Sequence, residues 1–339
     1  MARSEITIDL GALRRNAERL LETLGGAELW AVVKANGYGH GALDCGRAAL
    51  GAGATALCTA TVGEALALRL EFPDARLIVL GPAAPGELSA AQEARLELTV
   101  SQEPIPENVA VHLKLDTGMG RWGLSELPAP GRSVVGLMTH LATADTDLIF
   151  ARRQIARFRE ATEPYAHLTR HVAGSAAALR LPDARFDAGR CGIALYGLSP
   201  FGTNPAEDRL SPVLRWSSEV ALARLLRAGE STGYGRRFVA ERDTWIGIVP
   251  VGYADGFRRD LTGTEVVVGG ARRKVVGTVS MDAVAVELDG PVEAGADVTL
   301  VGDGVLLEEH ARAAGTIVYE LACGLDASPE RATRTVVGA

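Results

Sequence analysis

Lysine is scarce in this chain: the three lysines are Lys34, Lys114 and Lys274, and arginine supplies the rest of the 35 basic residues. Arginine cannot replace lysine as an amine nucleophile, as a Schiff-base former or as a base with a lowered pKa. A chain that otherwise uses arginine should keep lysine where that chemistry is needed. Neutral drift in a composition poor in lysine explains the small number of lysines about equally well. Lys34 is the first candidate for chemistry, because it lies in the glycine-rich stretch 33–41, VKANGYGHG.

The composition excludes several other classes of protein. With 339 residues, 47% hydrophobic and 23% charged, the chain has the profile of a globular protein with a large core. No apolar run approaches the roughly 20 residues of a membrane span, and residues 1–10 lack a signal segment, so we expect a cytoplasmic protein. A net charge of −7 without a basic cluster argues against nucleic acid as a partner. Four scattered cysteines argue against disulfides and against a zinc site.

Short apolar runs alternate with amphipathic stretches over the first two thirds of the chain. Each apolar run predicts a strand, and the amphipathic stretch after it, where it has a helical period, predicts a helix. Repetition of this unit favours a parallel (β/α)₈ barrel, although the connection at residues 101–108 holds two prolines and is too short for a full helix. The eight expected strands are residues 29–33, 54–60, 76–80, 96–100, 109–115, 134–139, 167–172 and 186–191.

The pattern changes after Gly197 to strands and tight turns, which predicts a second, mostly β domain. Residues 4–10 also alternate like a strand but lie outside the eight, so we expect them to join this second sheet. The predicted domains are therefore a barrel at residues 10–209 and a mostly β domain formed by 1–9 plus 210–339. Gly269-Gly270 is a hairpin signal, and the expected strands are residues 215–226, 245–251, 265–268, 274–279, 283–288 and 298–301.

In a parallel barrel the active site lies at the C-terminal edge of the strands. Polar residues and glycines that could take part in catalysis or binding gather at this predicted edge, where Lys34 ends the first strand and Lys114 ends the fifth. A random scatter would put as many on the opposite edge. The other residues on this rim are Arg121, His140, Ser175, Arg190, Gly192 and Ile193.

Eight segments, in order along the chain, resemble the motifs of alanine racemases. The stretch around Lys34 resembles the pyridoxal-phosphate attachment site of that family, and the remaining matches extend as far as Asp282. Their common order is more specific than any one motif. The segments are 33–41 (VKANGYGHG), 112–121 (HLKLDTGMGR), 139–145 (THLATAD), 171–177 (HVAGSAA), 189–197 (GRCGIALYG), 232–235 (TGYG), 251–256 (VGYADG) and 279–282 (VSMD).

The resemblance implies an enzyme that interconverts L-alanine and D-alanine and supplies D-alanine for peptidoglycan. It also implies a head-to-tail homodimer whose active sites lie between the barrel of one subunit and the β domain of the other. Lys34 would carry the cofactor and act as one acid–base group, and Tyr234 from the second subunit would be the other. Racemisation needs two such groups, because a proton leaves one face of Cα and another arrives at the opposite face. For this role the Lys34 amine must be neutral and Tyr234, with a reference pKa of about 10, needs a neighbouring charge or hydrogen bond.

The same resemblance assigns further residues to the cofactor. Arg190 would contact the pyridine nitrogen, and since arginine stays protonated that nitrogen would stay unprotonated, which makes the ring a weaker electron sink. His140 would pack against the ring, and Arg121 would lie near the cofactor's phenolic oxygen and the substrate carboxylate. Hydroxyls and free amides suit a dianionic phosphate. The residues matching the phosphate site are Tyr38, Ser175, Gly192 and Ile193.

The remaining matches border the substrate or leave alternatives open. Tyr253, Met281 and Asp282 would come from the β domain of the second subunit. Lys114 matches a lysine that is carbamylated in some members of the family; an unmodified Lys114 paired with Asp116 or another acidic residue fits the sequence equally well. No metal is implied.

Some features of the chain leave the interpretation open. The C-terminal region offers no counterpart to a phosphate-contacting tyrosine of the family, because Tyr319 comes too early. Pocket volume is not readable from sequence, so a serine or broad-specificity racemase is the alternative among enzymes. A cofactor-binding barrel without catalysis is the alternative from another class, but such proteins lack the β domain that carries Tyr234.

Overall fold

The computed structural model describes residues 3–338 and divides them into two compact units. One unit comprises residues 12–201 and 205–211. The other comprises residues 3–11, 202–204 and 212–338.

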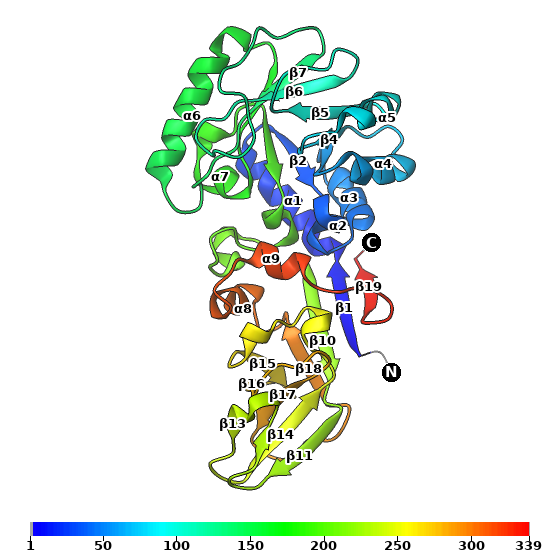
Figure 1. Ribbon diagram of the computed structural model, residues 1–339, viewed down its shortest axis with the longest axis vertical. Helices are drawn as coiled ribbons and strands as arrows, with labels where there is room; N and C mark the ends of the chain where they lie inside the picture. The colour runs from blue at the N-terminus through cyan, green and yellow to red at the C-terminus, as the bar shows by residue number, and fades with distance from the viewer. Residues whose placement is uncertain (1–2, 339) are drawn as a thin grey trace. The chain divides into compact units, whose positions relative to one another are not determined.

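In the first unit, eight parallel strands among residues 3–338 close into a barrel in chain order, which confirms the predicted architecture (Figure 1). The barrel closes where β2 pairs with β9, with Trp30 opposite Arg190. The strands are almost wholly buried, as expected for a parallel sheet covered by helices. They are β2 (Glu28–Val32), β3 (Ala56–Thr59), β4 (Leu77–Val79), β5 (Leu96–Val100), β6 (Ala110–Lys114), β7 (Val134–Met138), β8 (Thr169–His171) and β9 (Ala188–Cys191).

Helices connect most of these strands. Residues 101–109 join β5 to β6 without a helix, as predicted for this proline-containing segment, and residues 115–133 join β6 to β7 in the same way. The second connection carries Arg121. It contains three glycines with positive φ (Gly118, Gly120 and Gly123), which favour turns over a helix. The helices of the unit are α1 (Leu10–Leu24), α2 (Lys34–Tyr38), α3 (Ala42–Gly51), α4 (Val62–Glu71), α5 (Leu88–Glu93), α6 (Leu148–Thr162) and α7 (Ser175–Arg180), with 3₁₀ turns η1 (Pro85–Glu87), η2 (Glu163–Tyr165), η3 (Pro182–Ala184), η4 (Ile193–Tyr196) and η5 (Pro205–Asp208).

The second unit is built on a sheet of nine strands within the described residues, ordered β11-β14-β17-β16-β15-β18-β10-β1-β19. The N-terminal strand β1 lies between β10 and β19, so the prediction that it joins the second sheet is confirmed. The strands are β1 (Ser4–Asp9), β10 (Leu214–Glu219), β11 (Leu222–Leu226), β14 (Thr244–Val249), β15 (Glu265–Val268), β16 (Ala271–Val276), β17 (Val284–Leu288), β18 (Asp297–Val301) and β19 (Thr333–Val337), and β12 (Ser231–Thr232) pairs separately with β13 (Phe238–Val239).

Residues 215–226, predicted as one strand, are two. The amide of Val220 donates to Ala296 and that of Ala221 donates to Ile248, so the chain leaves the β18 side of the sheet and joins β14. The hairpin at Gly269-Gly270 is confirmed: both glycines have positive φ, and Val268 pairs with Ala271. The unit also contains η6 (Tyr234–Arg236), η7 (Tyr253–Asp255), η8 (Arg259–Leu261), α8 (Leu307–Ala313) and α9 (Val318–Cys323); the two α-helices and β19 were not predicted.

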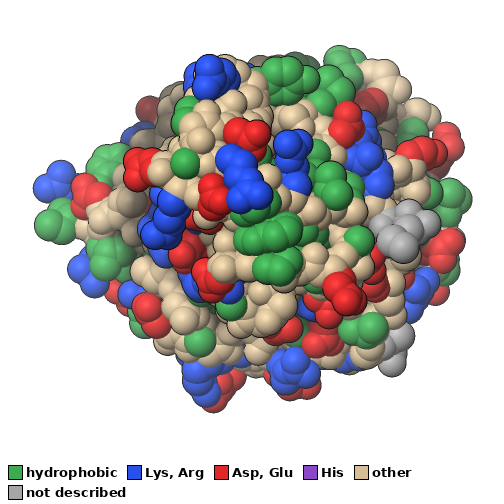
Figure 2. Space-filling model, turned by 90° about the horizontal axis from the view of Figure 1, so that it is seen from below, with side chains coloured by type: hydrophobic (Ala, Val, Ile, Leu, Met, Phe, Trp, Pro, Cys, Tyr) green, Lys and Arg blue, Asp and Glu red, His purple; other side chains and the backbone are tan. Residues whose placement is uncertain are grey.

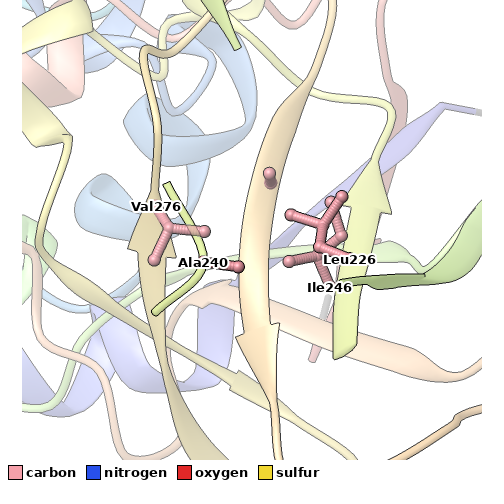
Figure 3. Packing of buried hydrophobic residues seen from close by; sticks show 5 residues of the cluster. Leu226, Ala240, Ile246 and Val276 are labelled. Atoms are coloured by element: carbon pink, nitrogen blue, oxygen red, sulfur yellow. The ribbon is translucent and has the colours of Figure 1, made fainter. Parts of the chain in front are cut away.

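A hydrophobic cluster packs on the sheet near the segment that carries Tyr234. Figure 3 shows Leu226 and Ile246 close together, with Ala240 and Val276 nearby. Ala285 completes the cluster. Elsewhere, the face drawn in Figure 2 intersperses acidic and basic side chains with apolar ones, so that face has no continuous patch of one charge.

Candidate active site

Lys34 follows β2 after one intervening residue, Val33, and begins a turn of unusual backbone geometry. Ala35, Asn36, Gly37 and Tyr38 all have φ between 51° and 64°, in the left-handed region. Three of these are not glycine, and such conformations cost roughly 1–3 kcal/mol each and persist only where the surrounding structure enforces them. The strained turn therefore places Lys34 and Tyr38 in a fixed relation at the end of the strand.

Two side chains hold the turn in place, Glu64 from outside it and Asn36 from within it. Glu64 accepts hydrogen bonds from Thr61 and Ala60 at the start of α4, and its second oxygen accepts from the Ala35 amide at 2.7 Å. Asn36 Oδ1 accepts from the Ala42 amide at 3.0 Å, at the start of α3. Glu64 thus caps a helix and braces the turn at Lys34. This role of Glu64 was not predicted from the sequence, although the spacing Thr-x-x-Glu of a capping box was visible there.

Lys114 and Arg121 lie beside each other at the end of β6 and in the loop that follows. The Asp116 carboxylate accepts amide hydrogen bonds from Gly118, Met119 and Gly120, which fold this loop. Although desolvation opposes it, these bonds lower the pKa of Asp116. Among residues 3–338, Lys114 makes no ion pair with Asp116, because that carboxylate is already engaged.

Both cations stack on one aromatic ring. The Lys114 nitrogen lies 5.6 Å from the centre of the Trp122 ring, and the Arg121 guanidinium lies 5.2 Å from it. Burial lowers the pKa of Lys114 to about 8, with further contributions from Arg121 and Arg190. The lowered pKa increases the neutral fraction of the Lys114 amine, and the neutral amine is the form that reacts with carbon dioxide.

Arg190 is buried in β9 and its guanidinium is held from several sides. Nη1 donates to His171 Nδ1 at 2.7 Å and to the His171 carbonyl at 2.8 Å. Nη2 donates to the carbonyls of Thr139 and Val172 and lies 3.4 Å from His140 Nδ1. Within the described part of the chain the remaining donor, Nε–H, has no acceptor, so one N–H of a buried cation stays available for a ligand.

His140 follows β7 and lies among four cationic groups. Burial, then the charges of Arg190, Lys114, Arg121 and Lys34, hold the pKa of His140 at about 3, so its ring is neutral. Burial also lowers the pKa of Arg190 to about 10, which leaves the guanidinium protonated at neutral pH. The rim is thus a cluster of cations, a setting that suits an anionic ligand.

A small hydrogen-bonding cradle lies at the end of β9. Ser175 Oγ accepts from the amides of Gly192 and Ala194, at 3.1 and 3.2 Å. The Ile193 amide, at the start of η4, makes no hydrogen bond within residues 3–338. Tyr38 closes the cradle, since a Cβ on Gly192 would lie 2.4 Å from its hydroxyl oxygen. The structure therefore brings together Tyr38, Ser175, Gly192 and Ile193, the four residues that the family resemblance assigns to the phosphate.

Tyr234, Tyr253, Met281 and Asp282 belong to the other unit, where three loops adjoin. Thr278 Oγ1 donates to the Tyr234 carbonyl at 2.8 Å, and the amides of Tyr253 and Ala254 donate to the carbonyls of Ser280 and Met281. The side chains of Tyr234, Tyr253 and Met281 are exposed, Tyr234 by 74%. Beside Tyr234 is a pocket of ≈ 390 Å³, lined by Thr232, Gly233, Tyr234, Ile248, Val276, Thr278, Ser280, Ala283, Val284 and Ala285.

Asp282 is fixed by arginines that sequence analysis did not single out. Arg331 Nη1 lies 2.7 Å from its carboxylate and 3.5 Å from that of buried Asp255. Arg3 contacts the same two aspartates and donates to the Asp282 carbonyl. No local signal predicts these pairs, because their partners are about 50 or more positions away in the chain. Lys274, the third lysine, is exposed on β16, where we interpret it as a surface charge.

Other kinds of site find no support in residues 3–338. No helix there is both long enough and apolar enough to cross a membrane. No group of three or more metal-binding side chains gathers in this part of the chain.

Comparisons with known proteins agree with this geometry. The alanine racemase N-terminal domain matches residues 8–200 and the C-terminal domain matches residues 213–333. Alanine racemase 1 of Bacillus subtilis (strain 168) is 39% identical over 96% of this chain and 91% of its own length. The alanine racemase of Streptomyces coelicolor is 40% identical, over 94% and 93%.

Solved structures give the same result for the fold. The crystal structure of alanine racemase from E. faecalis superposes with a TM-score of 0.91 at 35% identity, covering 99% of this chain and 98% of that one. The structure from Streptomyces coelicolor A3(2) gives a TM-score of 0.90 at 38% identity, with the same coverage. Since both domains and nearly the whole length match, the chain belongs to the alanine racemase family and is a pyridoxal-phosphate-dependent amino-acid racemase, an isomerase.

Proposed function

We propose that the chain racemises alanine by a two-base mechanism at a site shared between two copies of the chain. The observation that carries the proposal is the gathering of Lys34, Lys114, Arg121 and Arg190 at one barrel rim around a neutral His140. A cluster of cations without a matching set of carboxylates suits a dianionic ligand with a ring nitrogen, which is the chemistry of pyridoxal phosphate.

The residues present fit that cofactor group by group. The unpaired Nε–H of Arg190 is a donor for the pyridine nitrogen, and the free Ile193 amide is a donor for a phosphate oxygen. Ser175, Tyr38 and Gly192 would complete the phosphate site, and Lys34 would hold the cofactor through its amine. When bound, pyridoxal phosphate would supply the electron withdrawal that makes the Cα–H of an amino acid acidic.

The chain's own residues would move the protons. Lys34 Nζ would take or return a proton on one face of Cα, and the hydroxyl of Tyr234 of the partner subunit would do so on the other. High exposure of Tyr234 in its own unit supports this, because such a side chain is available to a second molecule. Arg121 would orient the substrate carboxylate, and Tyr253, Met281 and Asp282 of the second copy would border the substrate.

We propose further that Lys114 is a candidate for carbamylation and that the D-alanine formed supplies peptidoglycan. The lowered pKa of Lys114 supports the first of these, since a carbamate forms from the neutral amine. A carbamate beside Arg121 would restrain its guanidinium by charge. The role in peptidoglycan synthesis is tested with a strain from which the gene for this chain is deleted, which should need added D-alanine to grow. Growth of that strain without D-alanine would argue against a biosynthetic role.

Mixing two inactive variants tests the shared site. Lys34→Ala and Tyr234→Ala should each lose nearly all alanine racemisation in the presence of pyridoxal phosphate. After subunit exchange about half of the dimers are hybrids, and each hybrid has one site with both bases intact. About a quarter of the sites should therefore recover.

Two results would contradict the proposal. Full activity of Lys34→Ala would exclude Lys34 as a base, and no recovery after exchange, verified with differently tagged subunits, would exclude a shared site. Turnover of serine and lysine beside alanine would reveal a broader substrate range.

A further inference from the structure

The interior of the barrel contains a line of polar side chains that the proposed mechanism does not use. Barrels of this class are normally filled with layers of branched apolar residues. Here Glu97 of β5, His112 of β6 and His171 of β8 point inward and form hydrogen bonds with one another and with Arg190 of β9. Both histidines are fully buried. Such groups reduce stability unless each is satisfied, so their presence requires an explanation.

The contacts form one continuous chain. Arg190 Nη1 lies 2.7 Å from His171 Nδ1, His171 Nε2 lies 2.9 Å from His112 Nδ1, and His112 Nε2 lies 2.7 Å from Glu97 Oε2. The line of residues Arg190, His171, His112 and Glu97, here called the relay, therefore leads away from the candidate cofactor site through the barrel interior.

Only one arrangement of protons satisfies every contact in the relay. Arginine only donates, so His171 Nδ1 must accept and its proton must be on Nε2. His112 Nδ1 must then accept from that proton, and His112 Nε2–H donates to the Glu97 carboxylate. Every N–H points from Arg190 towards Glu97. An added proton on either ring would place two donors against each other and break the relay.

The surroundings favour this arrangement. Burial lowers the pKa of His112 and lowers that of His171 well below its ordinary value, so both rings are neutral. Burial alone would raise the pKa of Glu97, but hydrogen bonds from His112 and Arg76 bring it to about 2. The far end of the relay is therefore a fixed negative charge.

Packing fixes the rings as well. Trp30 lies 4.5 Å from the His171 ring and 5.7 Å from the His112 ring, measured between centroids. A Cβ on Gly136 would lie 2.2 Å from His112 Nδ1, so a glycine in the middle of β7 makes room for this ring. Arg76 grips the Glu97 carboxylate with two nitrogens, at 2.7 and 2.9 Å. The relay is a built feature of the barrel rather than loose polar filling.

We propose that Glu97 is a positioning residue for Arg190 and acts on it through His112 and His171. The relay uses one Nη1 donor of Arg190 and orients the guanidinium so that its Nε–H stays free. The inference rests on the proposed role of Arg190 beside the cofactor's pyridine nitrogen.

Two variants of the dimeric holoenzyme test this. Glu97→Gln keeps the shape of the side chain but removes the charge from the end of the relay. Arg76→Gln is its matched control, because it breaks the same Arg76–Glu97 ion pair and leaves the carboxylate on His112. We expect Glu97→Gln to lower kcat about tenfold, with the KM for alanine changed less than twofold, because Arg190 contacts the cofactor and not the substrate. The absorption spectrum of the bound cofactor and its pH dependence should shift in Glu97→Gln and stay close to wild type in Arg76→Gln.

Equal effects of the two variants on kcat, with unchanged cofactor spectra, would overturn the inference. A second measurement needs no variant: ¹⁵N-histidine NMR of the wild-type holoenzyme should show His112 and His171 as neutral rings protonated at Nε2. A ring protonated at Nδ1, or a charged ring at neutral pH, would also overturn it. A wild-type protein that fails to racemise alanine would instead refute the proposed function, so the two failures are distinguishable.

Discussion

Substituting Gly192 with alanine should weaken cofactor binding without preventing the barrel from folding. A Cβ at this position would lie 2.4 Å from the Tyr38 hydroxyl oxygen and 2.8 Å from Cζ, where ordinary contacts begin at 3.4 Å. Either the Tyr38 ring or the backbone at Gly192 must therefore move by about 1 Å. In the cofactor-free protein the ring can move aside. Binding of a phosphate would require the hydroxyl and the Gly192 amide to return together.

The free-energy cost of bringing the Tyr38 hydroxyl and the Gly192 amide back together sets the expected loss of cofactor affinity. Forcing one extra methyl group into a packed site costs about 1–3 kcal/mol. At about 1.4 kcal/mol per tenfold change, the dissociation constant for pyridoxal phosphate should rise roughly 5- to 140-fold. Absorbance titration of the cofactor-free variant with pyridoxal phosphate measures this constant.

Gly174→Ala is the matched control. It lies at the same rim, but its Cβ would meet His140 at 3.7 Å and the Arg190 carbonyl at 3.9 Å, which are ordinary contacts. The affinity of Gly174→Ala for pyridoxal phosphate should stay within a few-fold of wild type. If Gly192→Ala bound the cofactor as tightly as Gly174→Ala and wild type, the packing argument for the Tyr38–Gly192 cradle would be wrong.

Three further predictions concern charged side chains. Because burial lowers the pKa of Lys114 from 10.5 to about 8, the unfolded chain binds more protons between these values and stability should rise with pH across that window. Lys114→Met should abolish the rise, measured as urea midpoints of the cofactor-free protein at about pH 7.5 and about pH 9.5; an unchanged rise would exclude Lys114 as its source. Arg331→Ala removes the ion pair that holds the Asp282 carboxylate, and because Asp282 is proposed to border the substrate, the KM for alanine should rise more than kcat falls. A change in kcat alone would argue against a place for Asp282 beside the substrate. Exposed Lys274→Ala should leave both kinetics and the urea midpoint unchanged, and a loss of activity would refute its assignment as surface charge.

The barrel was predictable because buried parallel strands are continuous apolar runs, and most of the runs here are followed directly by a polar or glycine residue. Lys34, Lys114 and Arg190 could be placed on one rim from this pattern alone. The break between β10 and β11 was not predictable, since Val220 and Ala221 are as apolar as the strands they separate and only their hydrogen-bond partners differ. The short helices α8 and α9 and the final strand β19 have too few residues for a clear period.

The inward-facing polar residues mark the limit of sequence reasoning more sharply. Alternation along a strand places His112 on the same face as Lys114, and Glu97 on the same face as Thr99. Which of them meet across the barrel depends on register, and β6 shifts register against β7 between Val111 and His112. A lone histidine in an apolar strand gives no indication of such a shift. Gly136 was the available clue, because a glycine inside a central strand often marks the close approach of another group.

Two features that reduce stability meet on the neighbouring strands β2 and β9. The left-handed turn after Lys34 holds non-glycine residues in costly conformations, and the relay puts a carboxylate and two imidazoles where apolar side chains would pack better. Neither is needed to close a barrel. One sets the position of an amine and the other sets the position of a guanidinium, on neighbouring strands β2 and β9, where Trp30 pairs with Arg190. If stability alone determined these residues, the two features would have no reason to coincide on adjacent strands. Their coincidence is expected if both serve one ligand that contacts the amine at one end and the guanidinium at the other.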